Sequence, residues 1–167
     1  GSAAIKTDGT LWMWGNNAAG ACGINNNNTT AFSSPVQVPG TTWKAISVIG
    51  NFTGGMATKT DGTLWSWGYN SQGTLGHNTG GAGTDRSSPI QVGTDNDWDE
   101  PLGALGGYGG GVTVRKTDNT MWAWGSNSYG EQAQNDRVAR SSPTQVPGSW
   151  RQTAGGPGNG ILGLKYP

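Results

Sequence analysis

The sequence predicts an all-β fold built from repeated units of about four short strands, which is the content of one β-propeller blade. Three similar segments, KTDGTLWMWG, KTDGTLWSWG and KTDNTMWAWG, begin at Lys6, Lys59 and Lys116. A second block, SSPVQV, SSPIQV or SSPTQV, follows each of them and recurs every 54 residues. No segment shows the apolar period of a helix. A repeat of this length with short strands is typical of a propeller blade.

The tryptophans support this interpretation, because all nine occupy three equivalent positions of the repeat. Two of the positions lie two residues apart in one strand, so both indoles share a face of that strand. The third position follows the proline block. A strand face that carries two indoles needs a deep apolar partner, which a neighbouring blade can supply. We therefore predict a structural core that contains Trp12, Trp14, Trp43, Trp65, Trp67, Trp98, Trp122, Trp124 and Trp150.

The first two strands of each unit are predicted from the turn between them. In the first copy they cover Ala3–Thr7 and Leu11–Gly15, with Asp8-Gly9 between them. Asp-Gly favours a two-residue type I′ hairpin, in which both turn residues have positive φ. The third copy has Asp118-Asn119 there, and Asn is the best substitute for Gly in that conformation.

Two further strands complete the predicted unit. One begins at Pro35, because Pro in the first position of a strand costs no ladder hydrogen bond, and the last covers Ala45–Gly50. A Gly-rich turn follows the second strand, and its final Gly is replaced by Ala133 in the third copy, where we expect an altered turn. Variable loops come next, at Ile24–Phe32, His77–Arg86 and Gln134–Arg140.

We predict one domain over residues 1–167, with repeats at 6–58, 59–115 and 116–164. A Gly stands five residues before the Lys of each copy, at Gly1, Gly54, Gly111 and Gly160. Gly1 therefore fits the repeat, and both ends of the chain fall within a repeat. We expect the chain to be part of a longer protein.

The composition excludes several classes of function. Ten basic and ten acidic residues give a formal net charge of zero, and no basic cluster is present. Nucleic acids are bound by concentrated basic surfaces, so we predict no nucleic-acid partner. No run approaches the roughly 20 apolar residues of a membrane helix, so we predict no membrane insertion.

No catalytic residue, cofactor site or metal site is predicted. His77 and the single Cys22 stand at different repeat positions, which disfavours a Cys–His pair. The cluster Asp95, Asp97, Asp99 and Glu100 has the alternation of a calcium loop. That loop requires Gly at position six and Glu at position twelve, where this chain has Glu100 and Gly106. We expect a solvated acidic loop, with calcium binding as the alternative.

The pattern DGTLWxWGxNxxGxLG followed by SSPxQV resembles the repeat of the regulator of chromosome condensation family, most closely at Asp61–Gly76. The resemblance covers essentially the whole chain. It implies a seven-bladed propeller, of which this chain holds about three blades, and exposed edges invite strand pairing. The founding member is a guanine-nucleotide exchange factor that binds chromatin. This chain lacks both its basic tail and the His that often precedes the first strand.

The Trp-rich repeat is similar to forms in bacterial and phage proteins. We therefore expect a non-catalytic structural or protein-interaction propeller, in a phage virion or another extracellular or surface-exposed protein. Its expected partners are other protein subunits, including copies of itself or a virion assembly. The alternatives are a secreted bacterial inhibitor or adhesin, and a guanine-nucleotide exchange regulator. Candidate partner-binding residues vary among the repeats and are Phe32, Tyr69, His77, Tyr129 and Arg137.

Overall fold

Antiparallel sheets form the fold of the computed structural model, which describes the chain except residues 51, 106–109, 156–160 and 166–167. The one helix in these described parts is a short 3-10 turn, η1, at Ala18–Gly20. The all-β prediction is thereby confirmed. The strands are β1 (Ser2–Ile5), β2 (Leu11–Gly15), β3 (Phe32–Gln37), β4 (Trp43–Ile49), β5 (Gly54–Lys59), β6 (Leu64–Gly68), β7 (Arg86–Gln91), β8 (Trp98–Leu105), β9 (Gly111–Lys116), β10 (Met121–Gly125), β11 (Arg140–Val146), β12 (Trp150–Gly155) and β13 (Ile161–Lys165).

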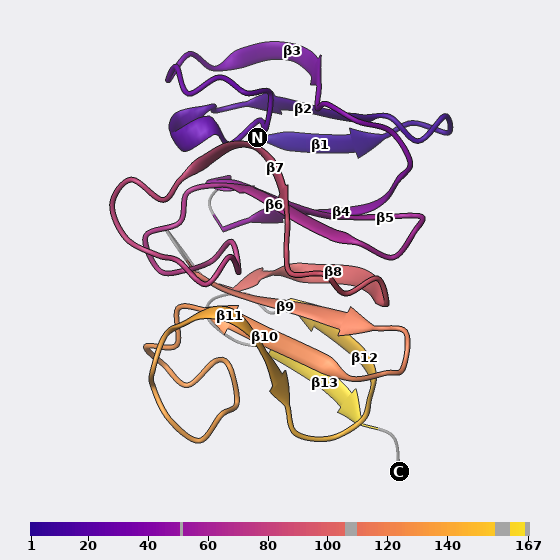
Figure 1. Ribbon diagram of the computed structural model, residues 1–167, viewed down its shortest axis with the longest axis vertical. Coiled ribbons are helices and arrows are strands. Elements are labelled where there is room, and N and C mark those ends of the chain that lie inside the picture. The colour runs from indigo at the N-terminus through magenta and orange to yellow at the C-terminus, as the bar shows by residue number, and fades with distance from the viewer. Residues whose placement is uncertain (51, 106–109, 156–160, 166–167) are drawn as a thin grey trace.

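The sheets are stacked along the long axis of the molecule (Figure 1). Their strand orders are β1-β2-β3, β4-β5-β6-β7, β8-β9-β10-β11 and β12-β13. Neighbouring sheets contact one another through the strand at one edge of each: β4 contacts β8, and β8 contacts β12. In the first sheet, which has no counterpart of β4 or β8, the strand that contacts β4 is β1. The two middle sheets are complete four-stranded propeller blades.

Each complete blade takes its strands from two successive sequence repeats. β4 precedes Lys59, where the second KTDGTLWSWG segment begins, and it pairs with β5 from Trp43↔Lys59 to Ile49↔Gly54. In the same way β8 pairs with β9, with Trp98 opposite Lys116. The third Trp of a repeat therefore belongs to the blade of the repeat that follows.

The turn between β1 and β2 differs from the predicted type I′ hairpin. Gly9 donates to the carbonyl of Lys6 and the Lys6 amide to Thr10, both at 2.9 Å. Gly9, Gly62 and Asn119 have φ values of 77°, 81° and 67°, whereas the preceding Asp residues are not at positive φ. This is the three-residue loop that closes a type I turn with one left-handed residue. The prediction was wrong because both loop types use Gly or Asn at that last position.

The third strand also begins earlier than predicted. β3 starts at Phe32, so Pro35 is its fourth residue and not its first. β3 lies at the edge of its sheet, and an edge strand is one of the places where a sheet tolerates Pro.

The turn at Ala133 keeps the conformation of its counterparts. Its φ is 53°, against 68° for Gly23 and 76° for Gly76. The expected alteration is therefore absent from the backbone of this turn.

The hydrophobic core lies between successive sheets. One cluster joins the first two sheets through Leu11, Met13, Trp43 and Trp67, and another joins the next two around Trp124. Met13 alternates with the two Trp of β2 and is buried together with Leu11, whereas Trp12 and Trp14 on the opposite face are only half-buried. Among the nine Trp, four are buried (Trp43, Trp67, Trp98 and Trp124) and five are half-buried (Trp12, Trp14, Trp65, Trp122 and Trp150).

Candidate interaction surfaces

Three indoles and a lysine form a compact cluster in the second blade. Trp43 of β4 meets Trp65 and Trp67 of β6 edge to face, with ring centroids 6.3 and 6.1 Å apart. The ammonium of Lys59 lies 4.8 Å from the ring centroid of Trp43 and 4.2 Å from that of Trp65. Edge-to-face packing and cation–π attraction both favour this arrangement.

The third blade repeats this cluster almost unchanged. Trp98 of β8 lies 6.0 Å from Trp122 and 6.2 Å from Trp124, again edge to face. Lys116 stands over Trp98 at 4.7 Å and over Trp122 at 4.9 Å. In both blades the cluster therefore includes the Trp that begins β4 or β8, which packs on the two Trp of β6 or β10.

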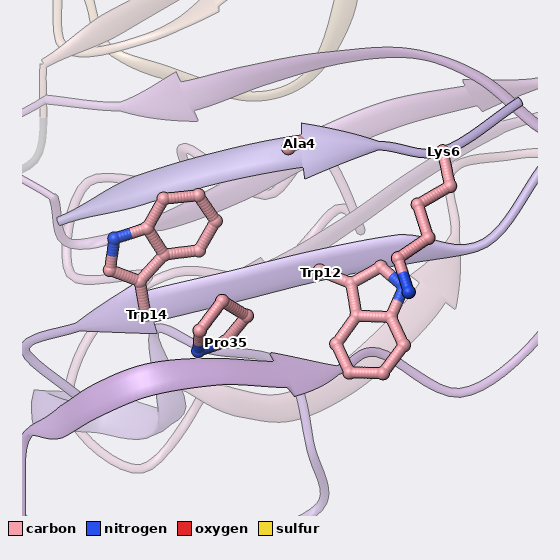
Figure 2. Close-up of a pocket in the computed structure, with 5 residues that line it drawn as sticks. All are labelled: Ala4, Lys6, Trp12, Trp14 and Pro35. Carbon is pink, nitrogen blue, oxygen red and sulfur yellow. The ribbon is translucent and has the colours of Figure 1, made fainter.

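The first sheet has a pocket where the other blades have that third Trp. Ala4, Lys6, Trp12, Trp14 and Pro35 line it (Figure 2), and its surface is mostly apolar. Lys6 covers only Trp12, at 4.0 Å. By sequence, Lys6, Trp12 and Trp14 correspond to the Lys59, Trp65 and Trp67 that surround Trp43.

The long connections between β2 and β3, β6 and β7, and β10 and β11 follow one another along one side of the stack (Figure 1). A buried Asn organises each connection, at Asn17, Asn70 and Asn127. The side-chain oxygen of each accepts the backbone N–H of the residue five positions later, at 2.9 to 3.0 Å. Each side-chain N–H donates to carbonyls further along the same loop, for example from Asn70 to Thr79 at 3.0 Å.

These three Asn had no assigned role in the sequence analysis. Each follows the WG of its repeat by two residues, in GNN, GYN and GSN. Their repetition in the WGxNxxGxLG part of the motif, just before the variable loops, was the signal that could have revealed this role. Their function is to hold loops of different sequence in one backbone form.

The β10–β11 connection is the most exposed of the candidate partner-binding regions. Tyr129 is 73% exposed and Val138 is 62% exposed, and Arg137 between them in the sequence is also exposed. Arg140 anchors the loop through an ion pair with Asp136 at 2.7 Å. The hydrogen bond from Arg140 lowers the pKa of Asp136 to about 2, assisted by the Val138 amide, so this pair persists over the whole neutral range.

The other candidates are more constrained. Phe32 is the first residue of β3 and packs on the first core cluster. Tyr69 is half-buried. His77 is half-buried, with Nε2 3.0 Å from the hydroxyl of Ser66. Burial is the main cause that lowers the pKa of His77, and Arg86 adds to it against an opposing Ile90 backbone hydrogen bond. His77 also lines a shallow pocket with Ile90 and Pro143.

The acidic segment 95–100 is engaged by cationic side chains. Lys116 bonds to Asp95 at 2.6 Å and Asp97 at 2.9 Å. Asp99 bonds to Lys44 at 2.9 Å and Arg115 at 2.6 Å. Through these ion pairs the carboxylates of residues 95–99 connect β8 and the segment before it to Lys44 of β4 and to the end of β9. Among the described residues, no cluster of three potential metal ligands is present.

In the part of the chain that the structure describes, no helix has the length and apolar character to cross a membrane.

Stacked four-stranded antiparallel sheets, in contact along one edge, define a protein of the β-propeller class. The sequence profile of the regulator of chromosome condensation (RCC1) repeat matches residues 8–55 and 61–99, which is more than half of the chain. The chain therefore belongs to the RCC1 repeat family, as its repeat motif predicted.

Solved structures share this fold over nearly the whole chain. Human WBSCR16 superposes with a TM-score of 0.78 at 18% identity, over 99% of this chain and 42% of its own. Prp20p from Saccharomyces cerevisiae, described with its binding to Gsp1p and histones, gives 0.78 at 16% identity, with the same coverage. Yeast RCC1 (Prp20) bound by Kap60 gives 0.77 at 15% identity, over 98% of this chain and 39% of its own. The chain thus spans about two fifths of these proteins, and the likeness shows the fold.

Proposed function

We propose that this chain is a non-catalytic β-propeller scaffold that presents its long loops to protein partners, as a structural part of a phage virion or another extracellular surface. The observation that carries the proposal is the β10–β11 connection, where exposed Tyr129, Arg137 and Val138 stand on a loop held by buried Asn127 and the Asp136–Arg140 pair. Exposed aromatic and Arg side chains on a rigid support are typical of interface hot spots.

The variation among the three loops supports this role. Their backbone turns are held by equivalent Asn residues, while the exposed positions differ in each copy. Binding residues occur disproportionately on loops that a rigid scaffold positions. The solved relatives fit the proposal, since Prp20p is described with its binding to Gsp1p and histones, and yeast RCC1 (Prp20) with Kap60 bound.

The test uses particles purified from the native source. We expect mass spectrometry to find the chain in the particle fraction. A variant that carries both Tyr129→Ala and Val138→Ala should enter particles at least tenfold less well, because losing a hot spot costs about 2 kcal/mol or more. Thr117→Ala is the matched control, since Thr117 is also exposed but lies in the short connection between β9 and β10 of the same blade.

Other outcomes would replace the proposal. A chain that is absent from particles and binds one soluble target through the same loop would be a secreted inhibitor or adhesin. Accelerated nucleotide release from a small GTPase would make it an exchange regulator. Equal incorporation of the loop variant and the Thr117→Ala control would remove the loop from the interface.

A further inference from the structure

We propose that Lys59, held over Trp43 and Trp65 in the second blade, is a binding site for an acidic segment of a partner protein. Lys59 ends β5, at the short connection to β6. The short connections of the blades lie on the other side of the stack from the long ones (Figure 1). The site is therefore separate from the β10–β11 loop, and the inference goes beyond the proposed function.

The third blade shows what such a site holds. The ammonium of Lys116 lies 4.7 Å from the ring centroid of Trp98 and 4.9 Å from that of Trp122. The same ammonium bonds to Asp95 at 2.6 Å and to Asp97 at 2.9 Å. Burial opposes the charge of Lys116, but the hydrogen bonds to the two carboxylates outweigh it and raise the pKa of this lysine. One ammonium can therefore pack on two indoles and bind two carboxylates, because it has three N–H donors.

The second blade has the same lysine without the carboxylates. Lys59 lies 4.8 Å from the ring centroid of Trp43 and 4.2 Å from that of Trp65. Within the part of the chain that the structure describes, no carboxylate forms an ion pair with it. Asp61 in the adjacent turn accepts the N–H and the hydroxyl of Thr63 instead, at 3.0 and 2.7 Å. Lys59 is half-buried, whereas Lys116 is buried, so a carboxylate from another protein can reach Lys59.

The difference arises in the segment that leads into the first Trp of each blade. This segment is PGTT at residues 39–42 and GTDND at residues 93–97. Both are anchored in the same way, since the carbonyl of their last residue, Thr42 or Asp97, accepts at 2.9 Å the N–H of the Thr that follows the lysine. The shorter segment contains no acidic residue. The chain therefore supplies carboxylates to one of two equivalent lysines and leaves the other for a partner.

Gly40 leaves room beside the ammonium of Lys59. A Cβ added at Gly40 would lie 3.7 Å from Nζ of Lys59 and 3.6 Å from the nearest ring atom of Trp43, which are ordinary contact distances. Gly40 is itself exposed. A side chain that enters from solvent can therefore occupy this space without displacing the ring or the lysine.

The occupant that fits is an extended segment with two carboxylates two residues apart, as in Asp95-Asn96-Asp97. A single exposed ion pair contributes little to binding. In the third blade two carboxylates share one ammonium, and the lysine side chain is only 9% exposed. A partner segment of this kind would pair with Lys59 twice and exclude water from it, which a free small acid cannot do.

The experiment titrates the full chain with a blocked peptide of sequence GTDND, and with GTNNN as the uncharged control. Nitrogen-15 NMR of the indole N–H groups is the readout. We expect saturable shifts of the Trp43 and Trp65 signals with GTDND alone. The signals of Trp98 and Trp122 should not move, because the chain's own carboxylates already occupy that lysine.

Two variants should weaken the binding of GTDND at least tenfold. Lys59→Met removes the cation, and Gly40→Asp fills the site from within by a carboxylate of the chain. Gly40→Asn is the matched control for Gly40→Asp, since both place a side chain at a φ of 95° and differ only in charge. It should weaken binding no more than threefold.

Lys44→Met is the matched control for Lys59→Met. It removes one positive charge from the exposed surface of the same blade, while Asp99 keeps its ion pair with Arg115. We expect Lys44→Met to bind GTDND within twofold of the original chain.

Equal shifts with GTDND and GTNNN, or equal losses in Lys59→Met and Lys44→Met, would overturn the proposal, because the attraction would then be general. Acetate that binds as tightly as GTDND would also overturn it, since the site would then take a small acid and not a protein segment. Particle incorporation through the β10–β11 loop is measured independently, so failure of that proposal is distinguishable from failure of this one.

Discussion

The indole nitrogen of Trp67 donates a hydrogen bond to the carbonyl of Ala21 in the preceding blade, at 3.1 Å. Trp124 makes the equivalent bond to Thr74 at 2.9 Å. Both rings are fully buried. One Trp of each blade therefore both fills the space between the sheets and satisfies a carbonyl of the neighbouring loop, which couples blade packing to loop position.

Replacing Trp67 by Phe should lower the free energy of unfolding by about 1–3 kcal/mol, because the carbonyl of Ala21 loses its partner in a buried place. Urea unfolding followed by far-UV circular dichroism measures the change. Trp65→Phe is the matched control in the same strand, since the half-buried Trp65 donates only to the hydroxyl of Thr63. Equal losses in the two variants would mean that ring volume, and not the bond to Ala21, decides the effect.

Gly76 should tolerate Ala less well than Gly83 does. Both have positive φ, 76° and 79°, where a side chain costs about 1–2 kcal/mol. A Cβ at Gly76 would lie 2.8 Å from the indole nitrogen of Trp124, whereas one at Gly83 meets nothing within 4 Å. We expect Gly76→Ala to cost a further 1–3 kcal/mol from overpacking, measured by the same unfolding experiment. A smaller loss than for Gly83→Ala would contradict the close packing of Trp124 on this turn.

The repeat made the sheets predictable, because strand pairs and turns follow from local sequence. The hairpin at Asp8-Gly9 was located correctly but assigned the wrong turn, since a left-handed Gly ends both kinds of loop. The burial of each Trp was not predictable in the same way. Trp14 and Trp67 end nearly identical segments, DGTLWMW and DGTLWSW, and they differ in burial because the loop with Ala21 packs on Trp67. Contacts of this kind arise between blades, which no single repeat encodes.

The candidate loop residues were chosen for their variation, and the structure places them unequally. Tyr129 and Arg137 are exposed, whereas Phe32 belongs to a strand and packs on the core. Variation alone cannot separate these cases, because a residue at a strand's first position can vary while it stays partly buried. The opposite case is that of Asn17, Asn70 and Asn127. They recur at one position of the repeat and are buried, while most residues of the loops that they hold differ between the copies.

Asn70 should determine the order of the β6–β7 loop. It is fully buried, accepts the Leu75 N–H at 2.9 Å and donates to the hydroxyl of Thr84 at 3.1 Å. Asn70→Ala leaves the Leu75 N–H unsatisfied, so we expect a loss of about 1–3 kcal/mol. Amide hydrogen exchange should become faster across residues 70–84. Gln72→Ala, at an exposed site of the same loop, should change neither. Unchanged exchange in Asn70→Ala would show that other contacts hold the loop.

The pH dependence of stability should include a contribution from Asp99. The hydrogen bond from Lys44, together with that from Arg115, holds the pKa of Asp99 below its ordinary value against the opposing effect of burial. Because the folded-state pKa is the lower one, the carboxylate stabilises the fold above the ordinary carboxyl range, near pH 4. That stability is lost as the pH falls through the folded-state pKa.

Asp99→Asn isolates this contribution, because the other carboxyl groups are common to both proteins. We expect Asp99→Asn to be less stable than the original chain at about pH 6, and the difference to shrink as the pH falls through the lowered folded-state pKa of Asp99, below which both proteins carry a neutral group. Unfolding midpoints in urea at several pH values measure it. Glu100→Gln removes the adjacent exposed carboxyl and should show a smaller change with pH. A difference that stays constant with pH would mean that Asp99 acts by packing and not by its charge. Asp99 forms ion pairs with Lys44 of β4 and with Arg115 of β9, which belong to neighbouring blades. If the difference stayed constant with pH, the pH dependence of the stability would arise from contacts other than these two ion pairs.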